Sequence, residues 1–210
     1  MRTILSIVLC CFCFTIFSQT TIKEVKIGTQ IWTTSNLNTS KFANGEIIPQ
    51  ARTAAEWKKA GEEGKPVWCY YNFIAENGKK YGRLYNWYAV NDKRGLAPKG
   101  YKIPTDEDWK TLVDFCGGIM EAGKKLKSAT GWNDKGNGIA PNGFNGLPGG
   151  FCLDDGMCAG LGSSGAWWTS SAGQYDNTAW DRYLEAEKNA SETYSESNGI
   201  GFSVRCIKVK

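Results

Sequence analysis

The most informative absence in this chain is histidine, which occurs nowhere in the 210 residues. Without an imidazole, the chain has neither Ser-His-Asp nor Cys-His nucleophilic catalysis, and no histidine ligand for a metal. The cysteines that follow the N-terminal segment also contain no C-x-x-C pair, so the spacing of a thiolate zinc site is missing. Any catalysis would therefore depend on carboxylates, lysine, tyrosine or a lone cysteine.

Runs of basic residues and long apolar runs are also scarce. Lys and Arg outnumber Asp and Glu by 25 to 21, and the basic residues are dispersed along the chain. A nucleic-acid partner is therefore not expected. After residue 18 no apolar run approaches the roughly 20 residues that a membrane-spanning helix needs. The mature chain is expected to have no membrane span.

The N-terminus has the pattern of an export signal. Arg2 precedes an apolar run over residues 4–17, and Ser18 is small. This predicts a secretory signal peptide comprising residues 1–18, with cleavage near Ser18. None of its cysteines follows the small residue of a lipoprotein cleavage site, which disfavours a lipid anchor. We expect a secreted, periplasmic or outer-surface protein with one domain, residues 19–210.

Export changes the interpretation of the remaining cysteines, because an oxidising compartment favours disulfides over reactive thiols. Five remain: Cys69, Cys116, Cys152, Cys158 and Cys206. Cys152 and Cys158 flank a turn-forming stretch, so a local bridge is plausible. Cys206 could pair with Cys69 or with Cys116, and the odd count leaves one thiol over.

Periodicity and turn residues predict short strands separated by helices and glycine-rich loops. The clearest helix covers residues 105–116: Thr105 is an N-cap, Asp108 lies three residues later, and two glycines follow the end. Another helix is expected over 53–62. The remaining predictions are two strands in 24–37, a strand at 67–73, a turn at Asn77-Gly78, a short helix at 84–90, and strands at 166–171, 179–185 and 201–209.

The stretch GLGSSG, residues 160–165, matches the G-x-G-x-x-G pattern of dinucleotide-binding loops. Such a loop must be followed by a helix whose N-terminus binds the pyrophosphate. Here AWWTSS follows, which is a poor helix opening and a good strand. The glycines therefore indicate a tight entry to a core strand, and no nucleotide is expected.

Two loop features suggest ligand binding. Trp132, Asn133 and Asp134 repeat the W-N-D triplet of C-type lectins, and residues 133–138 faintly resemble a calcium loop. Calcium is therefore possible, although a polar turn is the better interpretation and no cofactor is predicted. Aromatic faces could stack on sugar rings while amides and carboxylates bind hydroxyls, for which Asp176, Asn177 and Asp181 are well suited.

Carboxylates offer the one catalytic alternative that needs no histidine. Two of them suffice for glycoside hydrolysis. The available acids are Asp154, Asp155, Asp181, Glu185 and Glu187, of which Asp154 and Asp155 are also candidate ligand-binding residues.

The order of short motifs resembles one known family. IGTQIWTTSNLN, GKPVWCYYN, YGRLYNWYAVND, RGLAPKGYKIPTDEDW, AGKKLKSATGWNDKGNG, GFNGLPGG, WWTSS and GFSVRC occur in this sequence order. The chain therefore resembles the Fibrobacter succinogenes major paralogous domain over residues 24–209, a domain common in exported proteins of Bacteroidetes-type bacteria. The resemblance implies an α+β, C-type-lectin-like fold, with two main helices around a small twisted antiparallel sheet and long glycine-rich loops.

The resemblance also bears on the cysteines. Family members with WCYY commonly end in SVRC, which implies Cys69–Cys206 as the favoured bridge and Cys152–Cys158 as the second. Cys116 lies where the family usually has an aliphatic residue, so it is interpreted as a buried free thiol. The family supplies no catalytic or ligand residues to carry over.

These observations together predict an exported, non-catalytic binding or structural module of the bacterial cell surface. A glycan or a surface protein would bind to loops between residues 131 and 182. The alternatives are a carboxylate-dependent glycoside hydrolase or an enzyme resembling the formylglycine-generating enzymes of the same fold group.

Overall fold

The computed structural model describes residues 22–209. The predicted signal peptide, residues 1–18, lies outside this part of the chain. Within residues 22–209 no helix is both long and apolar enough to cross a membrane.

A small sheet brings the two ends of the domain together. Its strand order is β1 (Glu24–Ile27), β2 (Gln30–Thr33), β12 (Ile207–Lys208) and β5 (Tyr101–Lys102), and all its pairs are antiparallel. Gly28 has a φ of 59°, in the left-handed region that a tight β1–β2 turn requires and that glycine adopts without strain. The predicted strand pair around Gly28 is confirmed.

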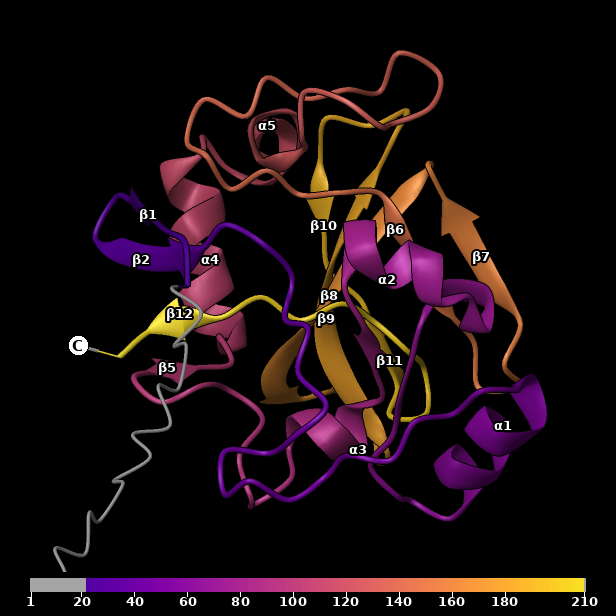
Figure 1. The fold of residues 1–210 in the computed structure, drawn as a ribbon. Helices are drawn as coiled ribbons and strands as arrows, with labels where there is room; N and C mark the ends of the chain where they lie inside the picture. The colour runs from indigo at the N-terminus through magenta and orange to yellow at the C-terminus, as the bar shows by residue number, and fades with distance from the viewer. Residues whose placement is uncertain (1–21, 210) are drawn as a thin grey trace, which may run out of the picture.

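A larger curled sheet forms the centre of the molecule (Figure 1). Its order is β10 (Ser191–Glu192), β9 (Thr178–Glu185), β8 (Ser164–Ala172), β6 (Gly149–Cys152) and β7 (Cys158–Leu161), and β11 (Ser195–Ser197) also pairs with β9. The β6–β8 pair is parallel, whereas the other pairs are antiparallel. Strand β8 begins within GLGSSG and contains AWWTSS, which confirms the predicted strand.

The remaining elements are short and surround the two sheets. Two strands pair with each other, β3 (Trp68–Cys69) and β4 (Leu84–Tyr85). The helices are α1 (Ala54–Glu62), the 3-10 turn η1 (Tyr71–Phe73), α2 (Ala75–Tyr81), α3 (Trp87–Val90), α4 (Asp106–Phe115) and α5 (Ile119–Leu126). In Figure 1, α4 stands beside the small sheet, whereas α1 lies at the opposite side of the molecule.

This architecture corrects the expected fold class. Strand makes up 29% of the structure and helix 22%, and the main feature is a curled, half-barrel sheet of five to six strands. Two main helices around a small sheet are therefore the wrong description. The sequence misled because the helices have clear local signals, whereas strands as short as two residues acquire their identity only by pairing with distant segments.

The two helices with sequence-encoded starts appear where they were predicted. Thr105 Oγ1 accepts from the Asp108 backbone N–H, and the Asp108 carboxylate accepts from the Thr105 N–H, so the capping box of α4 is complete. Thr53 caps α1 in the same manner by accepting from Glu56 N–H. These local bonds satisfy helix-end donors that would otherwise lack partners, so they depend little on the rest of the fold.

Three local predictions are wrong or shorter than expected. Asn77 and Gly78 lie inside α2 instead of forming a turn, because the absence of a side chain at Gly78 lets the Tyr70 ring pack directly on the helix backbone. The predicted strand 67–73 shrinks to β3 followed by η1. The segment 201–209 forms isolated bridges and the two-residue β12 instead of one continuous strand.

Tryptophan rings fill the core between the small sheet, α4 and the large sheet. The ring centroids of Trp32 and Trp109 lie 4.9 Å apart, and those of Trp109 and Trp167 lie 6.3 Å apart. Phe144 contacts all three of these rings with centroid distances of 5.5 to 6.0 Å. This packing explains most of the aromatic content without any ligand.

The cysteines confirm one predicted bridge and correct the other. Cys152 and Cys158 form a disulfide between paired positions of β6 and β7. The Cys69–Cys206 bridge is wrong, because both are free thiols that belong to different parts of the core. Cys69 Sγ instead lies 4.0 Å from Cys152 Sγ. Cys116 is a buried free thiol, as predicted.

Candidate functional site

Strand β9 divides its side chains between the two faces of the large sheet. Because successive strand residues point to opposite faces, Asp181, Tyr183 and Glu185 share one face. Arg182 and Leu184 occupy the other face, where Leu184 joins the tryptophan core. On the face that carries Asp181, α3 packs against part of the sheet, and Asp181, Tyr183 and Glu185 line a pocket.

This pocket has a volume of about 350 Å³ and is lined by acidic and apolar side chains. We refer to it as the Asp181 pocket. Its carboxylates are Asp181, Glu185 and Glu196, and no lysine or arginine of residues 22–209 lines it. Its volume lies within the range typical of small-molecule sites.

Aromatic rings from three segments form the walls of the Asp181 pocket. The Phe151 centroid lies 6.1 Å from that of Tyr183 and 6.1 Å from that of Phe202. Tyr194 packs edge-on against Tyr183 at 5.8 Å, and 40% of its surface is exposed. The Tyr183 hydroxyl donates to Ser164 Oγ at 2.8 Å, which fixes the ring. The pocket therefore combines flat apolar surfaces with hydroxyl and carboxyl groups.

Asp181 is the unusual group of this site. Its side chain is completely buried, and neither carboxylate oxygen has a hydrogen-bond partner among residues 22–209. The backbone N–H of Asp181, in contrast, is paired, because it donates to the Tyr194 carbonyl at 3.1 Å. Buried polar side chains in folded proteins nearly always have partners, so an unpaired buried carboxyl marks a place where something else is expected to bind.

Burial and a neighbouring charge determine the protonation of Asp181. Desolvation raises its pKa well above the usual value, and the negative charge of Glu196 adds to this effect, whereas the nearby Tyr194 backbone and the charge of Arg182 oppose it in part. Burial also raises the pKa of Glu196, with a further contribution from the charge of Asp154. The two carboxyls therefore act as coupled groups that hold protons at a higher pH than free acids do.

The charge of Arg182 offsets the raised pKa of Asp181 only in part. Arg182 follows it in β9 but points to the other face, where its Nη2 forms an ion pair of 2.6 Å with the Asp106 carboxylate. That contact ties β9 to the first turn of α4. Alternation along the strand thus separates the arginine from the carboxyl that precedes it.

Two of the other predicted residues lie beside the pocket. Asp154 and Asp155 occupy the turn between β6 and β7 and line a neighbouring hollow of about 320 Å³. Asp154 accepts from Ser197 Oγ at 3.0 Å, and Asp155 accepts from Met157 N–H at 2.8 Å. Asp154 is close enough for its charge to affect Glu196, so the two hollows are electrostatically connected.

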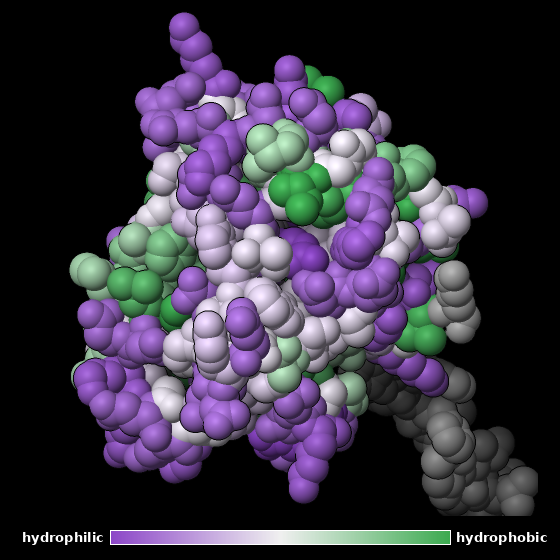
Figure 2. Space-filling view, turned by 180° about the vertical axis from the view of Figure 1, so that it is seen from behind, coloured by the Kyte–Doolittle hydropathy of each residue, from purple (hydrophilic) through white to green (hydrophobic). Residues whose placement is uncertain are grey.

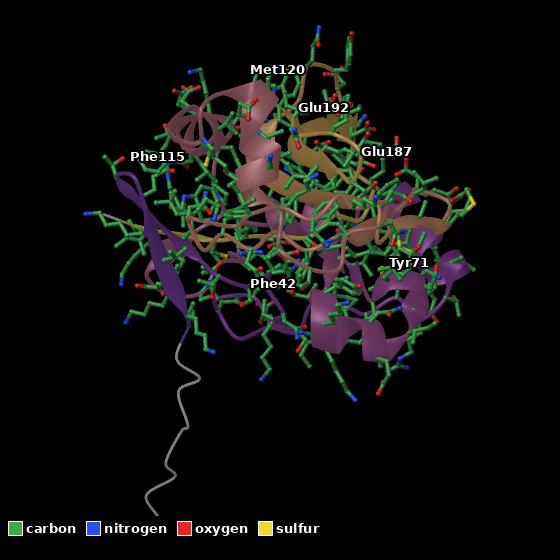
Figure 3. All side chains as sticks on the ribbon, turned by 90° about the horizontal axis from the view of Figure 1, so that it is seen from above. Phe42, Tyr71, Phe115, Met120, Glu187 and Glu192 are labelled. Carbon is green, nitrogen blue, oxygen red and sulfur yellow. A yellow bond between two sulfur atoms is a disulfide. The ribbon has the colours of Figure 1, made fainter. Side chains whose placement is uncertain are left out.

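The other predicted ligand residues do not join this site. Trp132 is buried in the core, and its indole N–H donates to Ser128 Oγ and to the Gly146 carbonyl. Asn133 and Asp134 are exposed in the turn after it, whereas Asp176 and Asn177 are exposed in the β8–β9 hairpin. The predicted residues therefore lie in separate places, and Asp181 is the one that lines the pocket. Glu187, a candidate acid of the hydrolase alternative, is exposed in the turn after β9 (Figure 3).

Most of the pocket is not predicted from the sequence. Neither Tyr183 and Glu196 nor the aromatic residues of the walls are among the predicted ligand residues. One signal was present: Asp181, Tyr183 and Glu185 alternate with period two inside a predicted strand, which places them on one face. No local signal connects them with Phe151 or Phe202, which arrive through tertiary packing.

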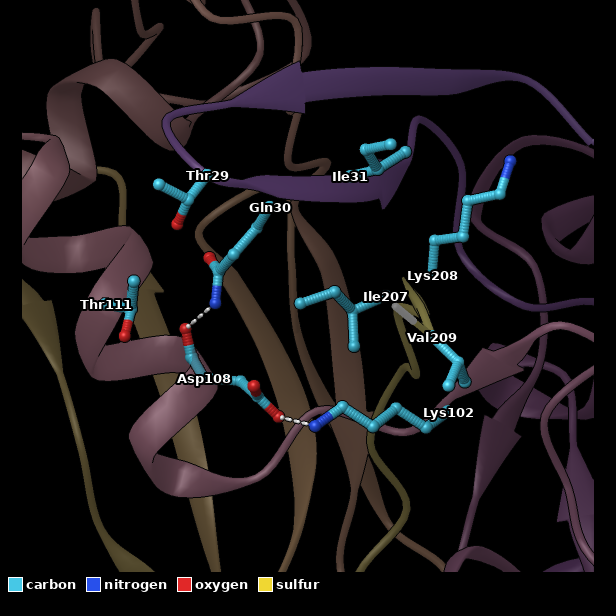
Figure 4. A pocket seen from close by; sticks show the side chains of 9 residues that line it. All are labelled: Thr29, Gln30, Ile31, Lys102, Asp108, Thr111, Ile207, Lys208 and Val209. Atoms are coloured by element: carbon cyan, nitrogen blue, oxygen red, sulfur yellow. Dashed lines mark hydrogen bonds and ion pairs between the residues drawn. The ribbon is translucent and has the colours of Figure 1, made fainter.

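A larger hollow of about 520 Å³ lies between β2, α4 and β12, but its polar groups are paired (Figure 4). Gln30 Nε2 donates to the Asp108 carbonyl at 2.9 Å, and Lys102 Nζ lies 2.8 Å from Asp108 Oδ2. The same carboxylate belongs to the capping box of α4. Because these groups satisfy one another, this hollow is a weaker candidate than the Asp181 pocket.

Neither a metal site nor a reactive thiol pair emerges from the described part of the chain. Within residues 22–209 no three acidic or cysteine side chains converge in a manner that could hold a metal ion. Burial raises the pKa of the Cys69 thiol, and it raises that of Cys206 to about 12. Reactive cysteines require a lowered pKa. The formylglycine-generating-like alternative therefore lacks support from these thiols.

Comparison with known proteins gives one match. The model of the Fibrobacter succinogenes major domain matches residues 25–208, which include all residues of the Asp181 pocket. No curated protein and no solved structure matches the chain. The role of the pocket must therefore be inferred from its own chemistry.

Proposed function

The chain belongs to the Fibrobacter succinogenes major domain family, and on that premise we propose that it is an exported, non-catalytic glycan-binding module of the bacterial cell surface. The glycan occupies the Asp181 pocket. The observation that carries this proposal is the pair of unpartnered Asp181 carboxylate oxygens at a pocket with aromatic walls.

The composition of the pocket suits a sugar. A pyranose ring has an apolar C–H face and polar hydroxyl edges, so it matches a site in which flat aromatic rings alternate with acceptors. Tyr183 and Tyr194 supply the rings, and Asp181 and Glu196 supply the acceptors. Burial of a ligand hydroxyl against Asp181 would provide the hydrogen bond that the carboxyl lacks.

Export is supported by two features of the chain. The apolar N-terminal segment has the pattern of a signal peptide. The Cys152–Cys158 disulfide is typical of proteins that fold in an oxidising compartment. A surface location would bring the pocket into contact with cell-wall or environmental polysaccharides.

A glycan array and a polysaccharide pull-down with residues 19–210 test this proposal. We expect binding to at least one glycan class, and we expect Tyr194→Ala to weaken it by about tenfold, equivalent to ~1.4 kcal/mol. Tyr175→Ala is the matched control, because it removes an exposed tyrosine that does not line the pocket. No glycan binding, or equal losses in the two variants, would contradict the proposal.

Glycoside hydrolysis is the second candidate, favoured by the raised pKa of Asp181 beside Glu196. A carboxyl whose pKa is raised by burial can act as a general acid, and a second carboxylate can act as base or nucleophile. Release of reducing sugar from a bound polysaccharide, lost in both Asp181→Asn and Glu196→Gln, would support catalysis. Binding without release supports the non-catalytic module.

A further inference from the structure

We propose that the Asp181 pocket selects a protonated amine, and that its ligand is therefore an amino sugar with a free ammonium group. The ammonium would lie against the Asp181 carboxylate, with the sugar frame between the aromatic walls. This inference rests on the proposed function of glycan binding and names the chemical class of the ligand.

The charges that line the pocket are of one sign. Of its three carboxylates, Glu185 already has a partner, because Lys188 Nζ lies 3.1 Å from Glu185 Oε2. Asp181 and Glu196 have no ion pair with any residue between 22 and 209. The site thus presents two uncompensated acids to an incoming ligand, which favours a cation over a neutral or anionic group.

Hydrogen bonding favours an ammonium over a hydroxyl. Asp181 has two buried oxygens to satisfy. A sugar hydroxyl donates one hydrogen bond and brings no charge, so it cannot compensate an ionised Asp181 and leaves the carboxyl protonated. An ammonium donates three hydrogen bonds and also supplies the opposite charge, and charge-assisted bonds of this type are roughly twice as strong as neutral ones. An N-acetyl group, in contrast, carries no charge and needs more room.

The walls of the pocket strengthen this preference. The faces of aromatic rings attract cations through the quadrupole of the ring. Tyr183 and Tyr194 pack at 5.8 Å, and Phe151 lies 6.1 Å from Tyr183, so the approach to Asp181 is bordered by three rings. Arg182 does not compete for the carboxyl, since it points to the opposite face of β9.

Binding of an amine should be linked to proton release. Burial raises the pKa of Asp181, so the free protein holds a proton that an ammonium ligand must displace. The affinity should therefore increase as the pH rises through the raised pKa of Asp181. The titratable or charged groups that face Asp181 or adjoin it are Tyr183 and Glu185 of β9, Tyr194 and Glu196 at β11, Asp154 of the β6–β7 turn, and Arg182 on the reverse face.

Calorimetric titration of residues 19–210 with methyl glycosides tests the inference. Glucosamine is expected to bind about tenfold or more tightly than N-acetylglucosamine or glucose, and Asp181→Asn should abolish that difference. Asp114→Asn makes the same chemical change on the exposed surface of α4 and should retain it. Circular dichroism verifies that each variant is folded.

The outcomes separate the inference from the function on which it rests. Equal affinity for the three glycosides overturns the amine preference but leaves a glycan-binding module. Absence of binding to any glycoside and to the glycan array overturns both. Tighter binding of Nα-acetyl-lysine amide than of glucosamine overturns the amino sugar and indicates a lysine side chain of a protein as the ligand.

Discussion

Three buried ionisable side chains differ in how their polar atoms are satisfied. Lys127 Nζ donates to the carbonyls of Glu185, Ala186 and Lys188 at 2.8 to 3.1 Å. Arg205 donates to two carbonyls and to one side-chain amide. Asp181 has no such partner among residues 22–209. The fold thus satisfies its buried bases internally and leaves one buried acid unpaired, which is the pattern expected where a site is kept for a ligand at a cost in stability.

This contrast predicts the effect of Asp181→Asn on stability. The variant removes a buried charge, so at pH 7 it should raise the free energy of unfolding by about 1–3 kcal/mol. Because the pKa of Asp181 is raised in the folded state, wild-type stability is highest below the unfolded-state pKa and falls as the pH rises through the folded-state value. The difference between variant and wild type should therefore grow from pH 4 towards pH 7.

Urea denaturation followed by tryptophan fluorescence measures these free energies. Asp114→Asn should change stability by less than about 0.5 kcal/mol, as exposed substitutions usually do. If Asp181→Asn proved less stable than wild type at pH 7, Asp181 would have a stabilising partner within the fold, which contradicts a ligand-binding role for its carboxyl.

At the scale of elements, the sequence predicts the helices whose starts are capped by a side chain, and it misses α2 and α5, which have no such cap. The starts of α1 and α4 are marked by Thr53 and Thr105. Helix α5 has no side-chain cap, since it starts after Gly118. It is placed by contact with β10, where the Lys124 N–H donates to the Asn189 carbonyl at 3.1 Å. No local signal identifies such a contact.

Two glycines in helices provide a matched test of this packing. A Cβ at Gly123 in α5 would lie 2.2 Å from the Ala190 carbonyl oxygen, whereas at Gly61 in α1 it would meet its nearest atom at 3.6 Å. Gly61→Ala should therefore stabilise the protein by up to about 1 kcal/mol through helix propensity. Gly123→Ala should destabilise it by about 1–3 kcal/mol, because α5 must move away from β10.

Thermal unfolding of the two glycine variants reports the sign directly. Opposite shifts of the melting temperature are expected, upward for Gly61→Ala and downward for Gly123→Ala. A rise in both would mean that α5 does not pack against the strand as closely as described.

At the scale of the whole molecule, Arg205 connects the small sheet to the large one. Its guanidinium donates to the carbonyls of Thr33 and Phe144 and to Asn36 Oδ1, which also accepts from the Trp167 indole N–H. Thr33 ends β2, and Trp167 lies in β8. Burial lowers the pKa of Arg205 to about 9. This side chain therefore lies at the junction of the two sheets.

Arg205→Met should loosen that junction. The substitution keeps apolar bulk but leaves the buried carbonyls of Thr33 and Phe144 without this donor, each at about 1–3 kcal/mol. It also removes the charge-assisted bond to Asn36 Oδ1, which keeps the bond from Trp167. We expect a loss of at least about 3 kcal/mol in the free energy of unfolding, with reduced hydrogen-exchange protection in β2 and β8 together. Loss of protection in the small sheet alone would show that the two sheets are not coupled through Arg205.

The face of the molecule seen in Figure 2 is mostly polar, with small apolar patches. Three large apolar side chains are exposed where α4 is followed by α5. They are Phe115, Ile119 and Met120, which are 62%, 57% and 73% exposed. Phe115 and Met120 are seen at that end of the molecule in Figure 3. This corner is distant in sequence from the Asp181 pocket and contributes no side chain to it.

The sequence by itself determined the features that depend on neighbouring residues or on ordered motifs. These are the capped starts of α1 and α4, the strand at AWWTSS, the Cys152–Cys158 bridge and the family. Asp181 is also among the predicted ligand residues, because it lies in a stretch rich in Asn and Asp whose side chains suit the binding of sugar hydroxyls. Each of these signals lies within a few residues or in the order of short motifs, so no tertiary contact is needed to recognise it.

Only the tertiary structure decided the curled sheet, the unpaired state of Cys69 and Cys206, and the composition of the pocket. Two-residue strands such as β5 and β12 exist because distant segments pair, and Cys69 is placed beside Cys152 by the same packing. The aromatic walls of the Asp181 pocket come from segments some 50 residues apart in sequence. Pairing and burial between such segments are properties of the folded chain, and local propensity does not encode them.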